Sequence, residues 1–288
     1  MSNIHTLVRG QRRLKLAELN GTITIPAQVA NWSARVVNNG GPKPSEKTIM
    51  ILSEFYQGLI DNNLLSKMVA VNCFVPDSIS ASITPLIVGP GQDPWTNTNF
   101  APGDLSIKGL AGNGSNKYLN SGINPYYVFT DTSAGMTTYI SNNPSPASNA
   151  LDGVAPGGGS TYYMNGCYAN LQLWHCWNNS AGQGNASCPA PQPTGYTSGN
   201  RTAANHSAIY FASSTFAHTQ SVLIKTNGGS RPNDVAWVFA NKVEGSAQFP
   251  HTHTLSFHAF HQGLLENESV IFYNLIQQMR MSLGGGYV

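Results

Sequence analysis

The sequence predicts an all-β protein built as a two-sheet antiparallel sandwich, with one helix before the first core strand and another at the C-terminal end. Short runs of alternating apolar and polar residues recur at the spacing that sandwiches use. Charged residues make up only 10% of the 288 residues, and glycine occurs 29 times, which suits many strands joined by turns. Two other stretches show the period of an amphipathic helix.

Charge and cysteine content exclude several classes of protein. The net charge of +2 gives no electrostatic case for a nucleic-acid or anionic-membrane partner. We expect no membrane span, because no window of about 18 apolar residues occurs, and no secretory signal peptide. None of the four cysteines lies in a C-x-x-C pair. We expect Cys73 to be a buried thiol, whereas Cys176 and Cys188 can pair in an oxidising medium.

Residues 1–44 are predicted to form an N-terminal arm, and residues 45–288 a single domain. Four basic residues crowd into the arm: Arg9, Arg12, Arg13 and Lys15. They form either a solvated tail or a docking arm for an acidic partner surface. Within the arm, residues 22–25 alternate like a short strand and residues 27–37 fit a brief helix.

The domain is predicted to begin with a helix and a buried strand. Ser45 is a suitable N-cap with Glu46 in the first turn, and the apolar residues that follow recur at helical spacing: Leu52, Phe55, Tyr56, Leu59 and Ile60. Residues 69–75 are apolar almost throughout, which indicates a strand covered on both faces. Residues 83–88 are also predicted to form a strand.

Residues 104–125 predict a β-hairpin with a glycine-rich tip. Apolar residues alternate on both sides of Gly112-Asn113-Gly114-Ser115, a run that tolerates the positive φ angles of a tight turn. Two strands cannot stand alone in water, so this hairpin needs a sheet around it.

The run from Gly109 to Pro125 also carries a resemblance. It is similar to the G-L-x-G-N-G-x-x-K-Y-L-x-T-G-x-N-P segment of phage-encoded and related proteins with a concanavalin A-like (laminin-G-like) jelly roll. The likeness extends from about Trp32 to Leu283, and its motifs are structural rather than catalytic. The resemblance implies a jelly-roll fold and a final helix packed on the sandwich.

The rest of the chain predicts further strands and a closing helix. Strands are expected at 126–130, 136–140, 168–177, 207–212, 221–226, 235–241 and 252–261. In the last of these, Leu255, Phe257 and Ala259 should share one face. Residues 142–160, rich in Pro, Ser, Gly and Ala, are predicted to be an exposed insertion. Helical spacing from Glu266 to Leu283, stopped by three glycines, predicts the last helix.

The acidic residues predict that the protein is not an enzyme. A glycan-cleaving enzyme of the concanavalin A-like class needs two carboxylates about 5 to 10 Å apart. The chain has 13 Asp and Glu, and no predicted strand carries them at alternate positions. Glu266 and Glu268 lie close together, but they stand at a helix start, where the helix dipole stabilises carboxylates without any catalytic role. A G-x-S-x-G elbow is missing as well.

Histidines and aromatic residues are the remaining candidates for a site. His251 and His253 lie two apart and would project from one face of a strand, where they can ligate a metal if a third ligand comes from elsewhere. The alternative is a polar sheet surface or trimer axis. Sugar-stacking aromatics are expected at Trp95, Trp177, Tyr162, Tyr163 and Tyr196. For Trp95, in a loop, we expect exposure, whereas Trp237 is expected in the core.

These observations and the resemblance together predict a non-enzymatic virion structural protein on the particle surface. It would decorate a phage head or tail, dock on other virion proteins through its arm, need no cofactor, and self-associate, since trimers are common among virion jelly rolls. The alternatives are a carbohydrate-binding module that holds a cell-surface or environmental glycan and, less favoured, a glycan-cleaving enzyme.

Overall fold

The computed structural model describes residues 24–142, 150–155, 163–167, 172–177, 185–187, 194–203, 206–213, 219–224, 231–248 and 250–286. The predicted basic residues of the arm and the strand at 22–25 fall largely outside this part of the chain. None of its helices is long and apolar enough to span a bilayer.

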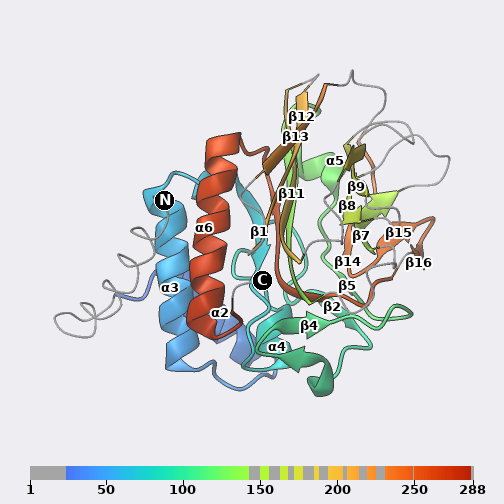
Figure 1. Cartoon of the computed structure of the whole chain (residues 1–288). Helices are drawn as coiled ribbons and strands as arrows, with labels where there is room; N and C mark the ends of the chain where they lie inside the picture. The colour runs from blue at the N-terminus through green and yellow to red at the C-terminus, as the bar shows by residue number, and fades with distance from the viewer. Residues whose placement is uncertain are drawn as a thin grey trace.

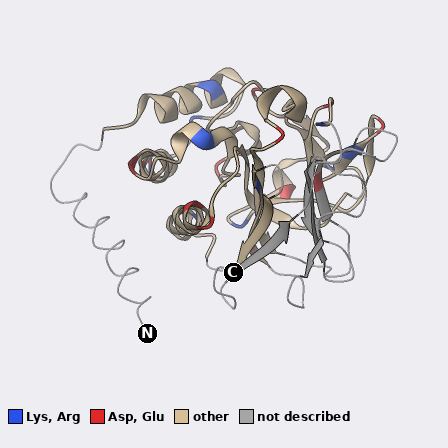
Figure 2. Ribbon diagram, turned by 90° about the horizontal axis from the view of Figure 1, so that it is seen from above, with Lys and Arg blue, Asp and Glu red and all other residues tan. Residues whose placement is uncertain are grey.

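The described chain folds into three layers: helices, a first β-sheet and a second β-sheet (Figures 1 and 2). The helices are α2 (Ala27–Asn38), α3 (Glu46–Asp61), α4 (Ile79–Ile83), α5 (Pro125–Val128) and α6 (Glu266–Leu283), with 3₁₀ turns at Leu65–Lys67 and Pro102–Asp104. In Figure 1, α3 and α6 lie side by side against the first sheet, with the second sheet on its other side. The prediction of two sheets with flanking helices is confirmed.

The first sheet has eight strands in the order β13-β12-β11-β6-β17-β4-β3, with β1 also paired to β17. All of its pairs are antiparallel. Its strands are β1 (Met68–Asn72), β3 (Leu105–Ser106), β4 (Gly109–Ala111), β6 (Ala134–Asn142), β11 (Gly195–Ala203), β12 (His206–Ala212), β13 (Thr219–Ile224) and β17 (Thr254–His261).

The second sheet has nine strands in the order β10-β9-β8-β7-β14-β5-β2, and β15 pairs in parallel with β7 and antiparallel with β16. Its strands are β2 (Thr96–Thr98), β5 (Tyr118–Asn120), β7 (Ala150–Ala155), β8 (Tyr163–Cys167), β9 (Gln172–Trp177), β10 (Asn185–Ser187), β14 (Trp237–Val238), β15 (Asn241–Val243) and β16 (Ser246–Gln248).

Local signals explain the helix ends. The Ser45 hydroxyl accepts the backbone N–H of Thr48, as an N-cap should, and the Asp77 carboxylate receives the Ser45 N–H and the Thr48 hydroxyl. Gly284 ends α6 with φ of 92°, a left-handed conformation that favours glycine. The two predicted long helices are confirmed for this reason.

Two hydrophobic cores lie on opposite faces of the first sheet. The helix-side core joins α2, α3 and α6 to the sheet, with the Phe257 ring 5.7 Å from Phe55 and 5.6 Å from Phe272 between centroids. Helix α2, which was predicted inside the arm, contributes Val29 and Trp32 to this core. The inter-sheet core lies between the two sheets and includes Trp95, Phe74, Phe239 and Phe260.

The predicted glycine-rich hairpin is wrong. β4 belongs to the first sheet and β5 to the second, so residues 112–117 cross between sheets instead of closing a hairpin. A Cβ on Gly112 would lie 2.1 Å from the carbonyl oxygen of His251, so glycine is needed there for a close backbone approach. The hairpin that does form joins β3 to β4, with Leu105 opposite Leu110.

Three other segments differ from their predicted form. Residues 83–88 make no strand; Ile83 ends α4, and Ile87 forms one isolated bridge with Val71. Residues 126–130 begin as α5, because Pro125 suits a first helical turn and the Asn124 side chain accepts the Tyr126 N–H. The predicted insertion at 142–160 contains β7, a paired strand of the second sheet.

The last strand carries an irregularity that alternation could not reveal. The pairing of β17 with β6 shifts register between Leu255 and Phe257. Leu255 therefore lies in the inter-sheet core, while Phe257 and Ala259 lie in the helix-side core. The expectation that these three side chains share a face is wrong.

Candidate functional site

A buried carboxylate lies between the two sheets. Asp152, on β7, is 3% exposed. Its Oδ1 accepts the Phe239 backbone N–H at 2.6 Å and lies 3.2 Å from Nε2 of His251. Its Oδ2 lies 3.4 Å from the Thr138 hydroxyl, which donates to it, and 3.8 Å from Nε2 of His258. One carboxylate thus joins both sheets.

Asp152, His251, His253 and His258 together form what we call the inter-sheet cluster. His253 stands beside His251, with ring centroids 5.0 Å apart, and His258 packs edge-on against Trp95 at 5.8 Å. All four residues of the cluster are buried. Both ring nitrogens of His253 and of His258, and Nδ1 of His251, make no hydrogen bond with the described residues.

Burial shapes the protonation of this cluster. Burial lowers the pKa of His253 to about 3 and that of His258 to about 4, because a charged imidazole is poorly solvated there. For Asp152, burial alone would raise the pKa, but the hydrogen bond and charge of His251, the charge of His258 and the Phe239 N–H together lower it. The arrangement favours an ionised Asp152 with neutral His253 and His258.

His251 and His253, the predicted metal pair, lie in a different place from the one predicted. His251 and His253 precede β17 rather than projecting from it, and they sit in the core instead of on a sheet surface. In the part of the chain that the structure describes, no group of three or more His, Cys, Asp or Glu residues could hold a metal ion. The described residues thus do not identify His251 and His253 as metal ligands.

Sequence reasoning missed Asp152. The carboxylate that the histidine run lacked comes from residue 152, inside the segment predicted to be an exposed insertion. Its signal was the acid in Leu151-Asp152-Gly153-Val154, flanked by apolar residues in a stretch otherwise poor in them. An acid in an apolar run that forms a buried strand needs a partner.

The predicted sugar-stacking aromatics fall into two groups. Trp95 and Tyr196 are both 0% exposed, so the expected exposure of Trp95 is wrong and neither ring presents a face to solvent. The Tyr196 hydroxyl hydrogen-bonds to Ser269 at 2.9 Å inside the helix-side core. Tyr162 lies outside the described residues. Tyr163 and Trp177 lie on β8 and β9, where the backbone alone is described.

The exposed aromatic pair of the described chain is Tyr126 and Tyr127, on α5. Their side chains are 41% and 74% exposed, and their rings meet edge to face with centroids 5.2 Å apart. The Arg231 guanidinium lies 5.0 Å from the Tyr126 ring centre and donates to the Tyr126 and Phe129 carbonyl oxygens. Its Nε pairs with Asp131 at 3.0 Å. We call Tyr126, Tyr127 and Arg231 the aromatic platform.

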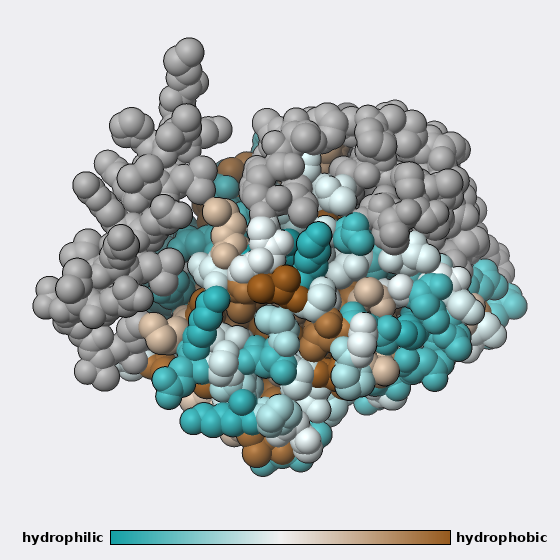
Figure 3. All heavy atoms as spheres, turned by 60° about the horizontal axis from the view of Figure 1, so that its bottom comes forward, coloured by the Kyte–Doolittle hydropathy of each residue, from teal (hydrophilic) through white to brown (hydrophobic). Residues whose placement is uncertain are grey.

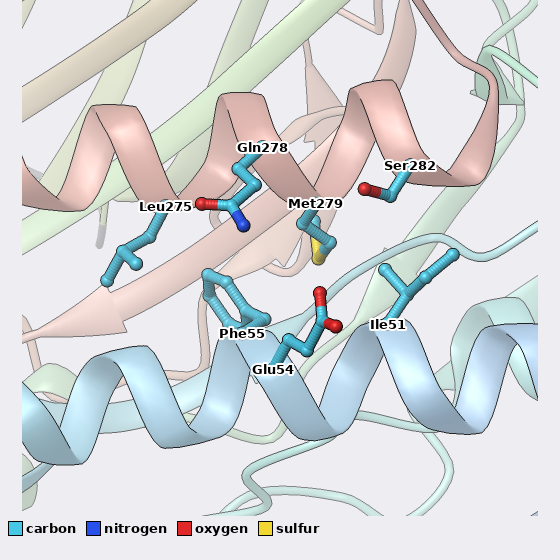
Figure 4. Close-up of a pocket in the computed structure, with 7 residues that line it drawn as sticks. All are labelled: Ile51, Glu54, Phe55, Leu275, Gln278, Met279 and Ser282. Atoms are coloured by element: carbon cyan, nitrogen blue, oxygen red, sulfur yellow. The ribbon is translucent and has the colours of Figure 1, made fainter. Parts of the chain in front are cut away.

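A small pocket between α3 and α6 is a weaker candidate (Figure 4). It is lined by Ile51, Glu54, Phe55, Leu275, Gln278, Met279 and Ser282. Burial raises the pKa of Glu54. Because Ile51, Phe55 and Met279 are buried in the packing of the two helices, the pocket is a gap in that packing with one carboxyl group at its edge.

In the views of Figures 2 and 3, charge and hydropathy mark no further site on the coloured, described part of the chain. The coloured basic and acidic residues in Figure 2 are scattered over the ribbon rather than gathered by sign. On the face that Figure 3 shows, the coloured apolar side chains form small patches separated by polar ones. Cys73 is a buried free thiol, as predicted, and burial raises its pKa.

Comparison with known proteins gives distant structural matches alone. No family model and no curated protein matches the chain. Domain 4 of AbnA, a GH43 extracellular arabinanase from Geobacillus stearothermophilus in complex with arabinotriose, is 14% identical over 72% of this chain and 98% of that one, with a TM-score of 0.44. Trypanosoma rangeli sialidase is 9% identical over 80% of this chain and 39% of that one, with a TM-score of 0.44.

A third match is a phage protein. The enzymatically active domain of bacteriophage CBA120 tailspike protein 2 is 12% identical over 65% of this chain and 30% of that one, with a TM-score of 0.42. Because glycoside hydrolases stand among these matches, the prediction that the protein is not an enzyme is wrong and is not kept. At these identities and TM-scores, we transfer no substrate, activity or residue role to this chain.

Proposed function

We propose that this chain is a glycan-binding protein of the virion surface and that the aromatic platform is its binding site. The observation that carries the proposal is the exposed Tyr126–Tyr127 pair. A tyrosine ring has an apolar face and a polar hydroxyl, so it is suited to the C–H face and the hydroxyls of a sugar ring. Exposed aromatic area of this kind is the usual mark of a binding surface.

The platform is held in place before any ligand arrives. Arg231 ties the carbonyl groups of Tyr126 and Phe129 to the Asp131 carboxylate, while Asn124 caps α5 and donates its side-chain amide to Asn233 at 2.9 Å. Rings that are already positioned lose less conformational entropy on binding. The amide groups add hydrogen-bond donors and acceptors beside the rings, as sugar hydroxyls require.

The virion setting of the proposal is supported by the sequence resemblance to phage-associated jelly-roll proteins. In this setting the sandwich has jelly-roll topology, decorates a phage head or tail, and self-associates. The basic N-terminal arm then docks on other virion proteins. Deletion of residues 1–21 tests the arm: we expect the shortened protein to lose cosedimentation with particles, and undiminished cosedimentation would contradict docking by this segment.

Retention on a panel of immobilised polysaccharides tests glycan binding. We expect retention of the wild type on at least one polysaccharide, and a loss of about tenfold in affinity for Tyr127→Ala, equivalent to ~1.4 kcal/mol. Ile107→Ala is the matched control, because Ile107 is another exposed apolar residue on a different surface loop. It should bind as the wild type does.

The outcomes separate the parts of this proposal. A wild type that binds no polysaccharide would overturn glycan binding. Binding that survives Tyr127→Ala would leave glycan binding and remove the platform as its site. The same incubations are assayed for new reducing ends, and their appearance would extend the function from binding to cleavage.

A further inference from the structure

We propose that the inter-sheet cluster is an acid-sensitive latch, which holds the two sheets together while its imidazoles are neutral and releases them when those imidazoles gain protons. The latch goes beyond glycan binding, because it concerns the interior of the sandwich and not the aromatic platform. Asp152, His251, His253 and His258 form it, as defined above.

The position of the cluster makes it a link between sheets. Asp152 belongs to β7 of the second sheet, whereas His258 belongs to β17, an interior strand of the first. Thr138, which donates to Asp152, lies on β6 of the first sheet. The polar contacts of one carboxylate therefore cross the whole inter-sheet layer, and any change in their charge acts on both sheets.

The cluster has one negative charge for three imidazoles. Asp152 already accepts the Phe239 N–H and lies 3.2 Å from Nε2 of His251. A proton on His258 meets this same carboxylate at 3.8 Å, and His253 has no hydrogen-bonding partner for either nitrogen among the described residues. A buried charge without a partner costs several kcal/mol.

Among the residues that the structure describes, the groups that face the cluster include no other anion. On the neighbouring strands, Thr138 of β6 and Asn72 of β1 stand opposite His258, and both are neutral. The Trp95 ring packs on the edge of His258. On the opposite face of β17, His261 feels the positive charge of Lys67, which also disfavours protonation.

The pKa directions agree with this geometry. His253 and His258 have pKa values of about 3 and about 4 in the closed protein, below the ordinary value of 6.5. Between pH 6.5 and about 4, His253 and His258 are therefore protonated in the open state but largely neutral in the closed state. The closed state is fully favoured above pH 6.5 and loses stability as the pH falls through that window.

The glycine-rich crossing segment 112–117, which we call the strap, hydrogen-bonds to the latch, so the exchange of its amides measures whether the latch is closed. The backbone N–H of Gly112 donates to the His253 carbonyl at 3.0 Å, and that of Gly114 donates to the His251 carbonyl at 3.1 Å. These bonds join the crossing segment 112–117 to the two histidines. If the sheets part, both amides lose their acceptors and exchange with solvent.

Amide hydrogen exchange of the full chain at pH 7.5 and pH 4.5 tests the proposal without any substitution. After correction for the intrinsic effect of pH, we expect the protection of Gly112 and Gly114 to fall at least tenfold at pH 4.5. The amides of α3 serve as the internal reference and should lose less. Equal protection of the strap at both pH values would overturn the latch.

Paired variants test which residues take up the protons. Urea unfolding is followed from pH 7.5 to pH 4.5 for the wild type, for His253→Gln with His258→Gln, and for the control His206→Gln at the start of β12. In the wild type, two titrating groups can raise the unfolding constant by up to about 100-fold for each pH unit of acidification. The double variant should lack this contribution. A double variant with the slope of the wild type would overturn the proposal. If it does not fold, the exchange experiment decides.

Discussion

The two faces of the first sheet are built on different principles. Toward the helices, β17 presents Phe257 and Ala259 to an apolar layer in which the tyrosine hydroxyls are satisfied, as in the bond from Tyr139 to Gln277 at 2.7 Å. Toward the second sheet, the same strand presents His258 to a layer that holds a carboxylate and unbonded imidazole nitrogens. One strand thus faces a mainly apolar core on one side and a core with a carboxylate and histidines on the other.

The difference shows which face controls which property. Apart from His261, the helix-side core gains its stability from apolar burial, which changes little with pH. The inter-sheet core adds the protonation of its histidines to that term, so its stability depends on pH. We therefore expect the helix-side face to set how stable the protein is and the inter-sheet face to set where in pH that stability fails.

The largest expected effect is on the helix-side face. Phe257→Ala removes a ring that is packed between Phe55 and Phe272, and it should lower the free energy of unfolding by about 3–5 kcal/mol. The loss should be the same at pH 7.5 and pH 5 in urea unfolding. A loss that grows on acidification would show that the two faces are not separate.

The second effect is on the inter-sheet face. Asp152→Asn keeps the shape of the side chain but replaces one of the two carboxylate oxygens that accept from Phe239, Thr138 and His251, and we expect a loss of about 1–3 kcal/mol at pH 7.5, since a buried donor is left without its acceptor. Asp131→Asn is the control: Asp131 forms a partly exposed ion pair, so its loss should be about 1 kcal/mol or less. Equal losses would mean that Asp152 is not paired as the geometry indicates.

A smaller effect is expected at the strap. Gly112→Ala places a Cβ 2.1 Å from the His251 carbonyl oxygen, so the crossing segment must shift and we expect a loss of about 1–3 kcal/mol. At Gly103 a Cβ would meet no atom within 4 Å, so Gly103→Ala should change stability by less than about 0.5 kcal/mol. Thermal unfolding of the two variants side by side measures the difference.

The smallest effect is expected at His261, a titrating residue on the helix side. His261 points to the helix side, where Thr137 and the Gln262 carbonyl satisfy it, yet burial lowers its pKa to about 4. Like His253 and His258, it weakens the folded state as the pH falls from 6.5 toward 4. His261→Gln should therefore remove at most one proton from the pH dependence of unfolding and leave the other two. If it abolished the dependence, the titrating face would be the helix side.

Much of the secondary structure was predictable because its causes are local. Ser45 caps the first turn of α3, and within α3 and within α6 each apolar residue lies one turn from the next apolar residue of the same helix. Alternation within β6, β12 and β13 likewise depends on residues of the strand itself. The segment 126–130 failed because Pro125 and Asn124 start a helical turn that outweighs its strand propensity. The glycine-rich segment failed because its partner, the His251 carbonyl, lies far along the chain.

The candidate sites were predictable only in part. The histidine run stood out in the sequence, but its carboxylate, Asp152, comes from a strand about 100 residues earlier. The exposed tyrosines were hidden inside a predicted strand, while Trp95, in a loop, is buried by the crossing of other segments.

The sequence by itself determined the longer helices α2, α3 and α6, several strands of the first sheet and a low-charge, turn-rich sandwich, because periodicity and capping act over a few neighbouring residues. The tertiary structure alone decided which strands share a sheet, which face Leu255 takes after the register shift, and which side chains meet in the inter-sheet cluster. Those outcomes depend on contacts between distant segments, and no pattern within one segment specifies its partner.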